Sequence, residues 1–305
     1  MTIRVAVANP KGGVGKSTTT LMVAEGLALK FGARVLVIDM DPQAGATKTL
    51  LGHRALTHLG ENNKGLGAIL LGWSQGKNIR LASHRMAASD LVELRDRTAG
   101  LVDIVPSNNE LLGVVGELET QLRKLKRRQR LDVVLGGLIN GALRPVETNY
   151  DLVLFDCPAG AVPLSLAAIR SVQHVLVPTN LEENSYTTLL DFFRFILTDD
   201  LKLSEQVQVH PLITMYHAGN PLQRQMLDHI NSRTYSLNAI PRPIPYATAI
   251  QVAQMHAGPG SYRYLREKYG TATSDLEALA ITVAKRIQLD TGGNHAGKTR
   301  TSRGA

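Results

Sequence analysis

Short runs rich in Val, Ile and Leu alternate along the chain with longer segments whose apolar positions recur at helical spacing. A continuous apolar run of roughly 4–8 residues is typical of a strand buried on both faces, as in a parallel sheet. We predict such strands at residues 3–8, 34–39, 101–105, 151–156, 174–178 and 207–216. Helices are predicted at residues 17–31, 109–142 with a break, 163–171, 184–200, 220–233 and 274–288. The alternation predicts an α/β fold with a doubly wound, mostly parallel sheet that helices cover on both faces.

Two stretches depart from this alternation. Residues 53–100 carry many Gly, Asn and Ser residues between short helical pieces, and we interpret them as an irregular elaboration of the sheet. Residues 290–305 are polar, Gly-rich and basic, so a disordered tail is predicted there. We therefore expect a single domain over residues 1–289.

Composition narrows the class of protein. The 305 residues are 44% hydrophobic, which is enough to fill a large core, and the single cysteine, Cys157, excludes an intramolecular disulfide. We find no apolar run of 18 residues and no secretory leader pattern, so we expect a cytoplasmic protein without a membrane partner. The net charge of +8 fits either an anionic partner such as nucleic acid or simple solubility.

The stretch NPKGGVGKSTTT, residues 9–20, follows the first predicted strand and precedes the first predicted helix. This context indicates a phosphate-binding loop, because the loop N–H groups and the helix N-terminus converge on one anion site. We expect backbone contacts to ATP from Gly12, Gly13, Val14 and Gly15. Lys16 is expected to reach the β- and γ-phosphates, Ser17 to ligate Mg²⁺ and Thr18 to donate to the α-phosphate.

A second lysine, Lys11, lies inside the same loop, on the far side of the phosphates from Lys16. A solvated side chain is one explanation of it. The more productive partner is a nucleotide held by a second copy of the chain, where Lys11 would stabilise charge on the transferring phosphoryl group as an arginine finger does. We therefore assign Lys11, with Lys16, to both ATP binding and catalysis.

KGGVGKST, residues 11–18, resembles the deviant Walker A box of the ParA/MinD group of P-loop ATPases, in which the extra lysine reaches across a nucleotide-sandwich dimer. Further segments resemble ParA segments in the same order: IDMDPQAGAT (38–47), NYDLVLFDCPAG (149–160), HVLVPTNLEENSYTTL (174–189), and the segments at 212–230 and 240–265. The resemblance covers nearly the whole predicted domain.

The predicted strand ends carry the acidic residues that a metal-dependent ATPase needs. Asp39 and Asp41 follow the second strand at i, i+2 spacing, so both point towards the loop edge of the sheet. We assign Asp41 to positioning or activating the attacking water. Asp39 is assigned to the water shell of Mg²⁺, and Asp156 is the expected Walker B carboxylate. The resemblance also implies that Met215, Pro241 and Pro243 flank the adenine.

The resemblance implies a ParA-type partition ATPase that is associated with the nucleoid. ATP would close a homodimer, the dimer would bind double-stranded DNA without sequence preference, and a ParB-like adaptor would stimulate hydrolysis and release. The cargo would be a plasmid, a chromosome or another large assembly. ParA proteins bind DNA through their C-terminal third, which places the candidate DNA contacts here at Arg224, Arg242, Arg263, Arg266 and Lys268.

Other interpretations stay open. A MinD-like membrane-surface regulator of cell division is the closest alternative, although the polar tail offers no apolar stripe. A metabolic ligase of the same fold is also compatible with the nucleotide motifs. A second basic stretch contains Arg123, Lys124, Lys126, Arg127, Arg128 and Arg130, and its simpler interpretation is a solvated helix face.

Overall fold

The computed structural model of the chain describes residues 2–77, 79–87, 90–95, 100–124, 129–182, 185–197, 207–233, 239–255, 258 and 260–290. Within them, seven strands form one sheet in the order β3-β4-β2-β5-β1-β6-β7. All neighbouring pairs are parallel except β3 with β4, which confirms the predicted mostly parallel sheet. The strands are β1 (Ile3–Val7), β2 (Arg34–Asp39), β3 (Met86–Ala87), β4 (Leu101–Val105), β5 (Leu152–Asp156), β6 (His174–Asn180) and β7 (Gln208–Thr214).

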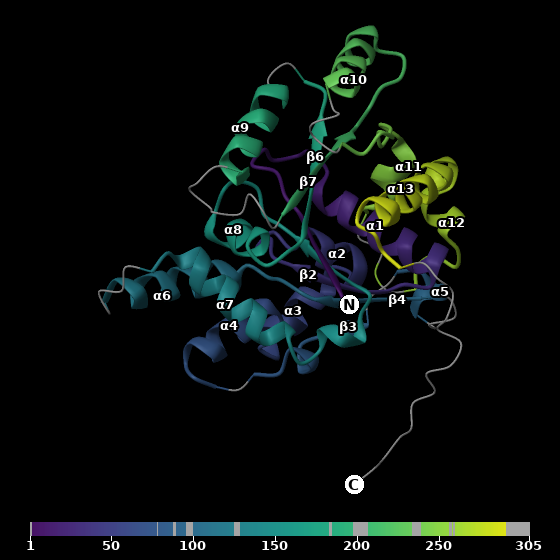
Figure 1. Ribbon diagram of the computed structural model, residues 1–305. Helices are drawn as coiled ribbons and strands as arrows, with labels where there is room; N and C mark the ends of the chain where they lie inside the picture. The colour runs from purple at the N-terminus through teal and green to yellow at the C-terminus, as the bar shows by residue number, and fades with distance from the viewer. Residues whose placement is uncertain are drawn as a thin grey trace.

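Helices cover both faces of the sheet, and Figure 1 shows the two layers on either side of it. One face packs against α1 (Lys16–Phe31), α2 (Gly45–Leu51), α5 (Val92–Arg95), α11 (Thr248–Ala253), α12 (Leu265–Tyr269) and α13 (Thr273–Arg286). The other face packs against α4 (Leu66–Ser74), α6 (Glu110–Lys124), α7 (Leu131–Leu143), α8 (Pro163–Ile169) and α9 (Ser185–Leu197). The doubly wound arrangement predicted from the sequence is therefore confirmed.

Strand alternation creates these two cores. Val5 and Val7 of β1 point into the α1 and α13 layer, whereas Ala6 points into the opposite layer. Helix α1 lies so close to α13 that a Cβ atom on Gly26 would lie 2.8 Å from the Cβ atom of Ala280. This close approach fixes the helix whose N-terminus carries the phosphate-binding loop.

The predicted elaboration over residues 53–100 contains, in its described part, short helices and an edge strand. These are α3 (Arg54–Glu61), α4, α5 and β3, and β3 closes the edge of the sheet beside β4. Its end is fastened to the C-terminal part of the chain, because the Tyr262 N–H donates to the Asp90 carbonyl at 2.9 Å. Apart from Asp290, the predicted tail lies outside the described residues.

A buried ionic cluster, formed by Glu25, Asp90, Lys268 and Tyr269, joins α1 to α12. The Lys268 Nζ atom lies 2.7 Å from Glu25 Oε1 and 2.8 Å from Asp90 Oδ1, and the Tyr269 hydroxyl donates to Glu25 Oε2 at 2.8 Å. None of the three charged side chains is exposed to solvent. The prediction that Lys268 contacts DNA is therefore wrong, because its ammonium group is enclosed by the core and neutralised there.

None of the described helices combines the length and the apolar character that crossing a bilayer requires. The remaining helix, α10 (Pro221–Arg233), follows β7, and its Ile230 belongs to a small apolar cluster with Leu181 and Ile213.

Candidate functional site: a phosphate loop and its neighbours

The loop between β1 and α1, residues 8–15, is shaped to receive an anion. Gly13 and Gly15 have φ angles of 73° and 84°, in the left-handed region that favours glycine. A Cβ atom added to Gly12 or Gly13 would meet no heavy atom within 4 Å, so the backbone borders open space. Because the first N–H groups of α1 have no partners within the helix, this end of α1 attracts negative charge.

Lys16, the first residue of α1, is only 8% exposed, and its Nζ atom donates to the Lys11 carbonyl at 3.0 Å. Burial lowers the pKa of this ammonium, and the charges of Asp156 and Asp41 partly offset the effect of burial. The side chain thus curls across the loop, with its cation beside the space that the glycines border. This is the arrangement expected of a lysine that binds phosphate.

Two carboxylates end neighbouring strands beside this loop. Asp39 of β2 and Asp156 of β5 are direct partners across the strand pair, and neither is exposed. Asp39 Oδ2 accepts hydrogen bonds from the Thr47 N–H and hydroxyl at 2.9 Å and 2.7 Å. Asp156 Oδ1 accepts one from the Thr20 hydroxyl at 3.1 Å. Asp156 Oδ2 has no hydrogen-bond partner among the described residues.

Burial raises the pKa of both carboxyls, and the charge of Asp156 raises that of Asp39 further. A cation bound between the two carboxyls would favour their ionised forms and would give the unpartnered oxygen a partner. Ser17 lies on the same side, close enough for its hydroxyl to help lower the pKa of Asp156. The structure thus brings together Ser17, Asp39 and Asp156, the predicted metal-binding set.

These residues fit magnesium better than a metal that needs a complete protein cage. Among the described residues, no group of three or more His, Cys, Asp or Glu side chains gathers closely enough to hold an ion. Mg²⁺ ordinarily keeps several waters and takes its other ligands from one or two carboxylates and substrate phosphates. One hydroxyl and two carboxylates beside a phosphate loop meet that requirement.

Asp41 lies two residues beyond β2 and is partly exposed. Its Oδ1 atom accepts the Gln43 N–H at 2.8 Å, which orients the carboxylate, and its charge raises the pKa of Lys16. Asp41 is therefore near the phosphate loop but, unlike Asp39, accessible to water. The predicted role in activating water is untested by this geometry.

Lys11 is held at its backbone and at its side chain. Its N–H donates to Asn9 Oδ1 at 2.8 Å, while Asn9 Nδ2 donates to the Pro178 carbonyl of β6 at 2.7 Å. The Lys11 ammonium forms an ion pair with Glu182, two residues beyond β6, and lies 3.4 Å from Asn180 Oδ1. Within one subunit, the ammonium of the second lysine is thus paired with Glu182, and its side chain remains 32% exposed.

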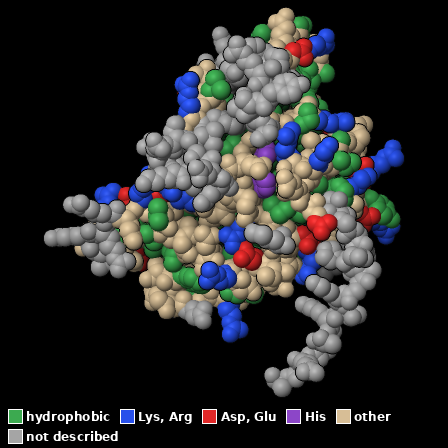
Figure 2. Space-filling view, viewed as in Figure 1, with side chains coloured by type: hydrophobic (Ala, Val, Ile, Leu, Met, Phe, Trp, Pro, Cys, Tyr) green, Lys and Arg blue, Asp and Glu red, His purple; other side chains and the backbone are tan. Residues whose placement is uncertain are grey.

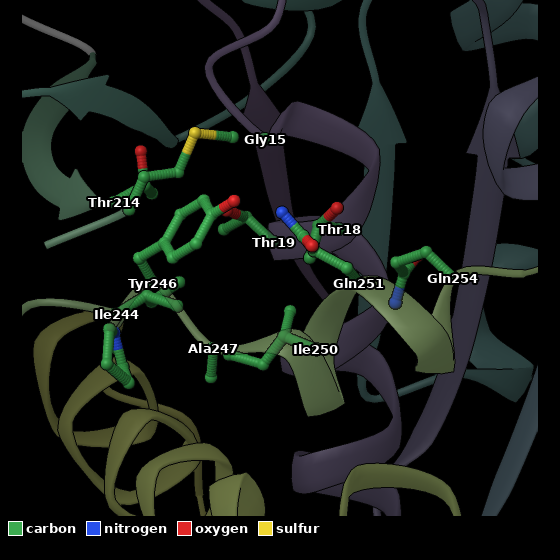
Figure 3. Close-up of a pocket in the computed structure, with 12 residues that line it drawn as sticks. Gly15, Thr18, Thr19, Thr214, Ile244, Tyr246, Ala247, Ile250, Gln251 and Gln254 are labelled. Carbon is green, nitrogen blue, oxygen red and sulfur yellow. The ribbon is translucent and has the colours of Figure 1, made fainter.

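A cavity of about 300 Å³ opens beside the loop and is bordered by Gly15, Thr18 and Thr19 of the loop and α1. Figure 3 shows the Tyr246 ring and the Gln251 side chain reaching towards Thr18 and Thr19. Met215, which is predicted to flank the adenine, also borders the cavity, and its φ angle of 54° is unusual for a non-glycine residue.

Other residues that follow β7 border the same cavity. Pro241 and Pro243 do not border this cavity, and residues 244–247 do so instead. The reason is local: Ile244 pairs back onto β7 through its N–H to the Ile213 carbonyl at 2.8 Å, and the chain after it turns along the cavity towards α11. Tyr246, which also stacks on His217 with 4.4 Å between ring centroids, and Gln251 were not predicted as site residues. The segment 240–265 already resembled a ParA segment, and its Tyr and two Gln residues are the sequence features that could have pointed to this cavity.

Four of the predicted DNA contacts are exposed: Arg224, Arg242, Arg263 and Arg266. Arg242 pairs with Asp275 at 3.1 Å, and Arg224 donates to the Ala218 carbonyl at 2.8 Å. On the face shown in Figure 2, lysine and arginine side chains are interspersed with acidic and apolar ones and form no continuous stripe among the coloured residues. In the other basic stretch, Arg123, Lys124 and Arg130 are exposed, and Lys126, Arg127 and Arg128 lie outside the described residues.

Comparison with known proteins agrees with this geometry. The family AAA_31, described as an AAA domain, matches residues 2–209. The chromosome partitioning protein ParA of Caulobacter vibrioides is 30% identical over 80% of this chain and 82% of its own length. A putative replication protein A of Rhizobium rhizogenes is 29% identical over 82% of this chain, and the match spans 59% of that longer relative.

Solved structures show the same fold. A plasmid partition protein from Borrelia burgdorferi bound to AMPPNP superposes with a TM-score of 0.69 at 19% identity, over 94% of this chain and all of the other. Cobyrinic acid a,c-diamide synthase from Mycobacterium smegmatis, with bound ATP analog and magnesium, gives 0.63 at 25% identity, over 82% and 89%.

The doubly wound sheet and the glycine loop between β1 and α1 define a P-loop protein of the nucleotide-hydrolase class. The family model and the ParA relative identify the family within that class. The chain belongs to the ParA family of partition ATPases.

Proposed function

We propose that this chain is a magnesium-dependent ATPase that acts as a partition switch in the cell interior, on nucleoid DNA. Its ATP-bound form pairs with a second copy and binds duplex DNA without sequence preference. An adaptor protein on the cargo stimulates hydrolysis, and the subunits then separate and leave the DNA. The cargo is a plasmid, a chromosome or another large assembly.

The nucleotide chemistry rests on the loop and the strand ends. The loop N–H groups of residues 12–15 hold the triphosphate, Lys16 neutralises its β- and γ-phosphates, and Thr18 donates to the α-phosphate. Ser17, Asp39 and Asp156 hold Mg²⁺, which withdraws charge from the phosphates when it is bound. The unpartnered Asp156 Oδ2 atom supports this assignment.

Asp41 positions or activates the attacking water. Its partial exposure and the hydrogen bond from Gln43 support a carboxylate that is oriented yet still hydrated. Asp39 cannot exchange roles with it, because Asp39 is buried and committed to Thr47. The base occupies the cavity between Met215 and Tyr246, which lies next to Thr18.

The single observation that best supports the proposed dimer is the contrast between the two loop lysines. Lys16 is buried and contacts its own loop, whereas Lys11 is partly exposed and pairs with Glu182 at the rim of the loop. A subunit that already neutralises its phosphates with Lys16 and the helix N-terminus has no second place for this cation. In the dimer, Lys11 reaches the partner's triphosphate and stabilises the charge that develops there.

The dimer also explains how ATP controls DNA binding. The exposed arginines at positions 224, 242, 263 and 266 contact phosphates rather than bases, and pairing doubles the number of such contacts. Because each contact releases counterions, doubling them steepens the dependence on salt, while the need for a dimer makes the binding depend on ATP.

Retention of the protein on immobilised random duplex DNA, compared with capture on anionic phospholipid vesicles, tests the proposal. Retention on duplex should require ATP and Mg²⁺, fail with ADP and disappear as salt rises. An Asp41→Ala variant should stay bound with ATP because it cannot hydrolyse it. Equal retention with ADP and ATP would contradict the switch, and ATP-dependent capture by vesicles instead of duplex would favour the membrane-surface alternative.

A further inference from the structure

A second feature of the loop concerns the state before the dimer forms. In the single subunit, the Lys11 ammonium is not merely solvated but is paired with Glu182. The pair follows from the sheet order: Lys11 lies in the loop after β1, Glu182 lies two residues after β6, and β1 and β6 are neighbours. Both side chains therefore lie beyond the carboxyl ends of neighbouring parallel strands.

Three contacts direct Lys11 towards this carboxylate. Asn9 accepts its N–H and is itself fastened to β6, so the backbone at Lys11 is held against that strand. Lys16 donates to the Lys11 carbonyl at 3.0 Å. Asn180, the last residue of β6, places Oδ1 3.4 Å from the ammonium and completes the polar surroundings. The lysine is thus oriented towards its own subunit before any nucleotide or partner arrives.

Glu182 itself is 61% exposed, and among the described residues Lys11 is its ionic partner. A carboxylate so accessible to water adds little to the stability of the fold, because exposed ion pairs contribute weakly. It does neutralise and orient the Lys11 ammonium, which according to the proposed function acts on the nucleotide of another subunit. An exposed pair also yields readily to a triphosphate, which offers several negative charges in place of one.

We infer that Glu182 is a positioning residue that holds Lys11 within its own subunit until the partner's nucleotide displaces it. The inference rests on the proposed function, because it supposes that Lys11 acts on the partner's ATP. The pair sets the protein concentration at which ATP closes the dimer, and it keeps Lys11 away from its own nucleotide. This regulation of dimerisation involves only the Lys11–Glu182 pair and needs no change in the fold.

Two measurements test this role with Glu182→Gln, Glu182→Asp and a matched control, Glu117→Gln, which removes an exposed carboxylate from α6. The first is the rate of acetylation of Lys11 in nucleotide-free protein, followed by peptide mass spectrometry. The second is the protein concentration at half-dimerisation, from sedimentation with Mg²⁺ and a non-hydrolysable ATP analogue.

Glu182→Gln should label at Lys11 about two- to fivefold faster and should dimerise at about two- to tenfold lower concentration, since two ion pairs are released in each dimer. Glu182→Asp should restore both values towards the wild type, and Glu117→Gln should change neither. Unchanged labelling, or faster labelling without tighter dimerisation, overturns the inference while leaving the proposed function intact. Weaker dimerisation of Glu182→Gln also overturns it. Failure of the wild type to dimerise would overturn both.

Discussion

Lys268 and Lys11 each form an ion pair with carboxylates, but in opposite surroundings. Lys268 lies in the buried ionic cluster with Glu25 and Asp90, where none of the side chains is exposed. Lys11 pairs with Glu182 at the rim of the phosphate loop, where both side chains meet water. The buried pair stays formed, because breaking it would leave an unpaired charge in the core. The exposed pair opens and closes readily, because water can solvate either partner.

The comparison teaches that burial, more than charge, decides what a basic residue can do. Burial alone would lower the pKa of Lys268, but the carboxylates of Glu25 and Asp90 outweigh it and raise the pKa, so the residue stays charged inside the core. Arg266, two positions earlier on α12, is exposed and available to an external partner. Two positions of one short helix therefore differ in role, because Lys268 belongs to the core and Arg266 is accessible at the surface.

Replacing Lys268 by Met should give the largest effect. Glu25 and Asp90 would then share a buried site without a cation, which typically costs about 3–5 kcal/mol of unfolding free energy. Urea denaturation at neutral pH measures it. Lys30→Met is the matched control, because Lys30 is 43% exposed and its contact with Glu277 spans 3.9 Å. A loss below about 1 kcal/mol for Lys268→Met would contradict the buried cluster.

Asp90→Asn should give a smaller, pH-dependent effect. Burial raises the pKa of Asp90 above its ordinary value of 3.8, and the charge of Glu25 raises it further. The folded state therefore favours protonated Asp90, so the wild type loses stability as pH rises above about 4, through the window between the ordinary and the raised pKa.

Asn cannot ionise, so the stability of Asp90→Asn relative to the wild type should increase from pH 5 to pH 8. An increase of up to about 2–3 kcal/mol is expected, since the raised pKa of Asp90 is about 7 and one pKa unit corresponds to about 1.4 kcal/mol. Urea midpoints measured at both pH values provide the test. A relative stability that stays level or falls with pH would show that Asp90 is ionised in the cluster without cost.

Lys11→Met should change the unfolding free energy of the nucleotide-free protein by less than about 1 kcal/mol, because the pair that it removes is exposed. Urea denaturation beside Lys268→Met makes the contrast direct. A loss as large as that of Lys268→Met would mean that Lys11 is a structural residue of the loop.

Arg266→Gln should give the smallest effect. Stability should be unchanged, and ATP-dependent retention on duplex DNA should weaken slightly, with the slope against log salt reduced by about one for each phosphate that the arginine no longer neutralises. Arg123→Gln on α6 is the matched control for removal of an exposed positive charge. Equal slopes in all three proteins would remove Arg266 from the DNA surface.

The sequence predicted most of the fold because apolar runs and the glycine loop are local signals. The strands at 34–39 and 101–105 match β2 and β4 in both bounds, and the predicted break in 109–142 corresponds to the end of α6 and the start of α7. Edge strand β3 was not predicted, since two residues carry no periodicity. Its existence depends on pairing with β4.

Within the site, the loop, Asp39 and Asp156 could be predicted because each follows a recognisable strand. The burial of Lys268 and the cavity beside Thr18 could not. A lysine beside two tyrosines and an arginine has the pattern of a basic surface, and only the tertiary contacts with Glu25 and Asp90 show that it is enclosed. Similarly, the register of Ile244 on β7, rather than any local motif, directs residues 244–247 to the cavity.

The central claim is that two subunits face each other and that each lends Lys11 to the other's triphosphate. Sedimentation velocity with Mg²⁺ and a saturating non-hydrolysable ATP analogue tests it most directly, on the wild type and on Lys11→Met. The account predicts a species of twice the subunit mass for the wild type and single subunits for the variant. Single subunits in both samples, or dimers in both, would contradict it.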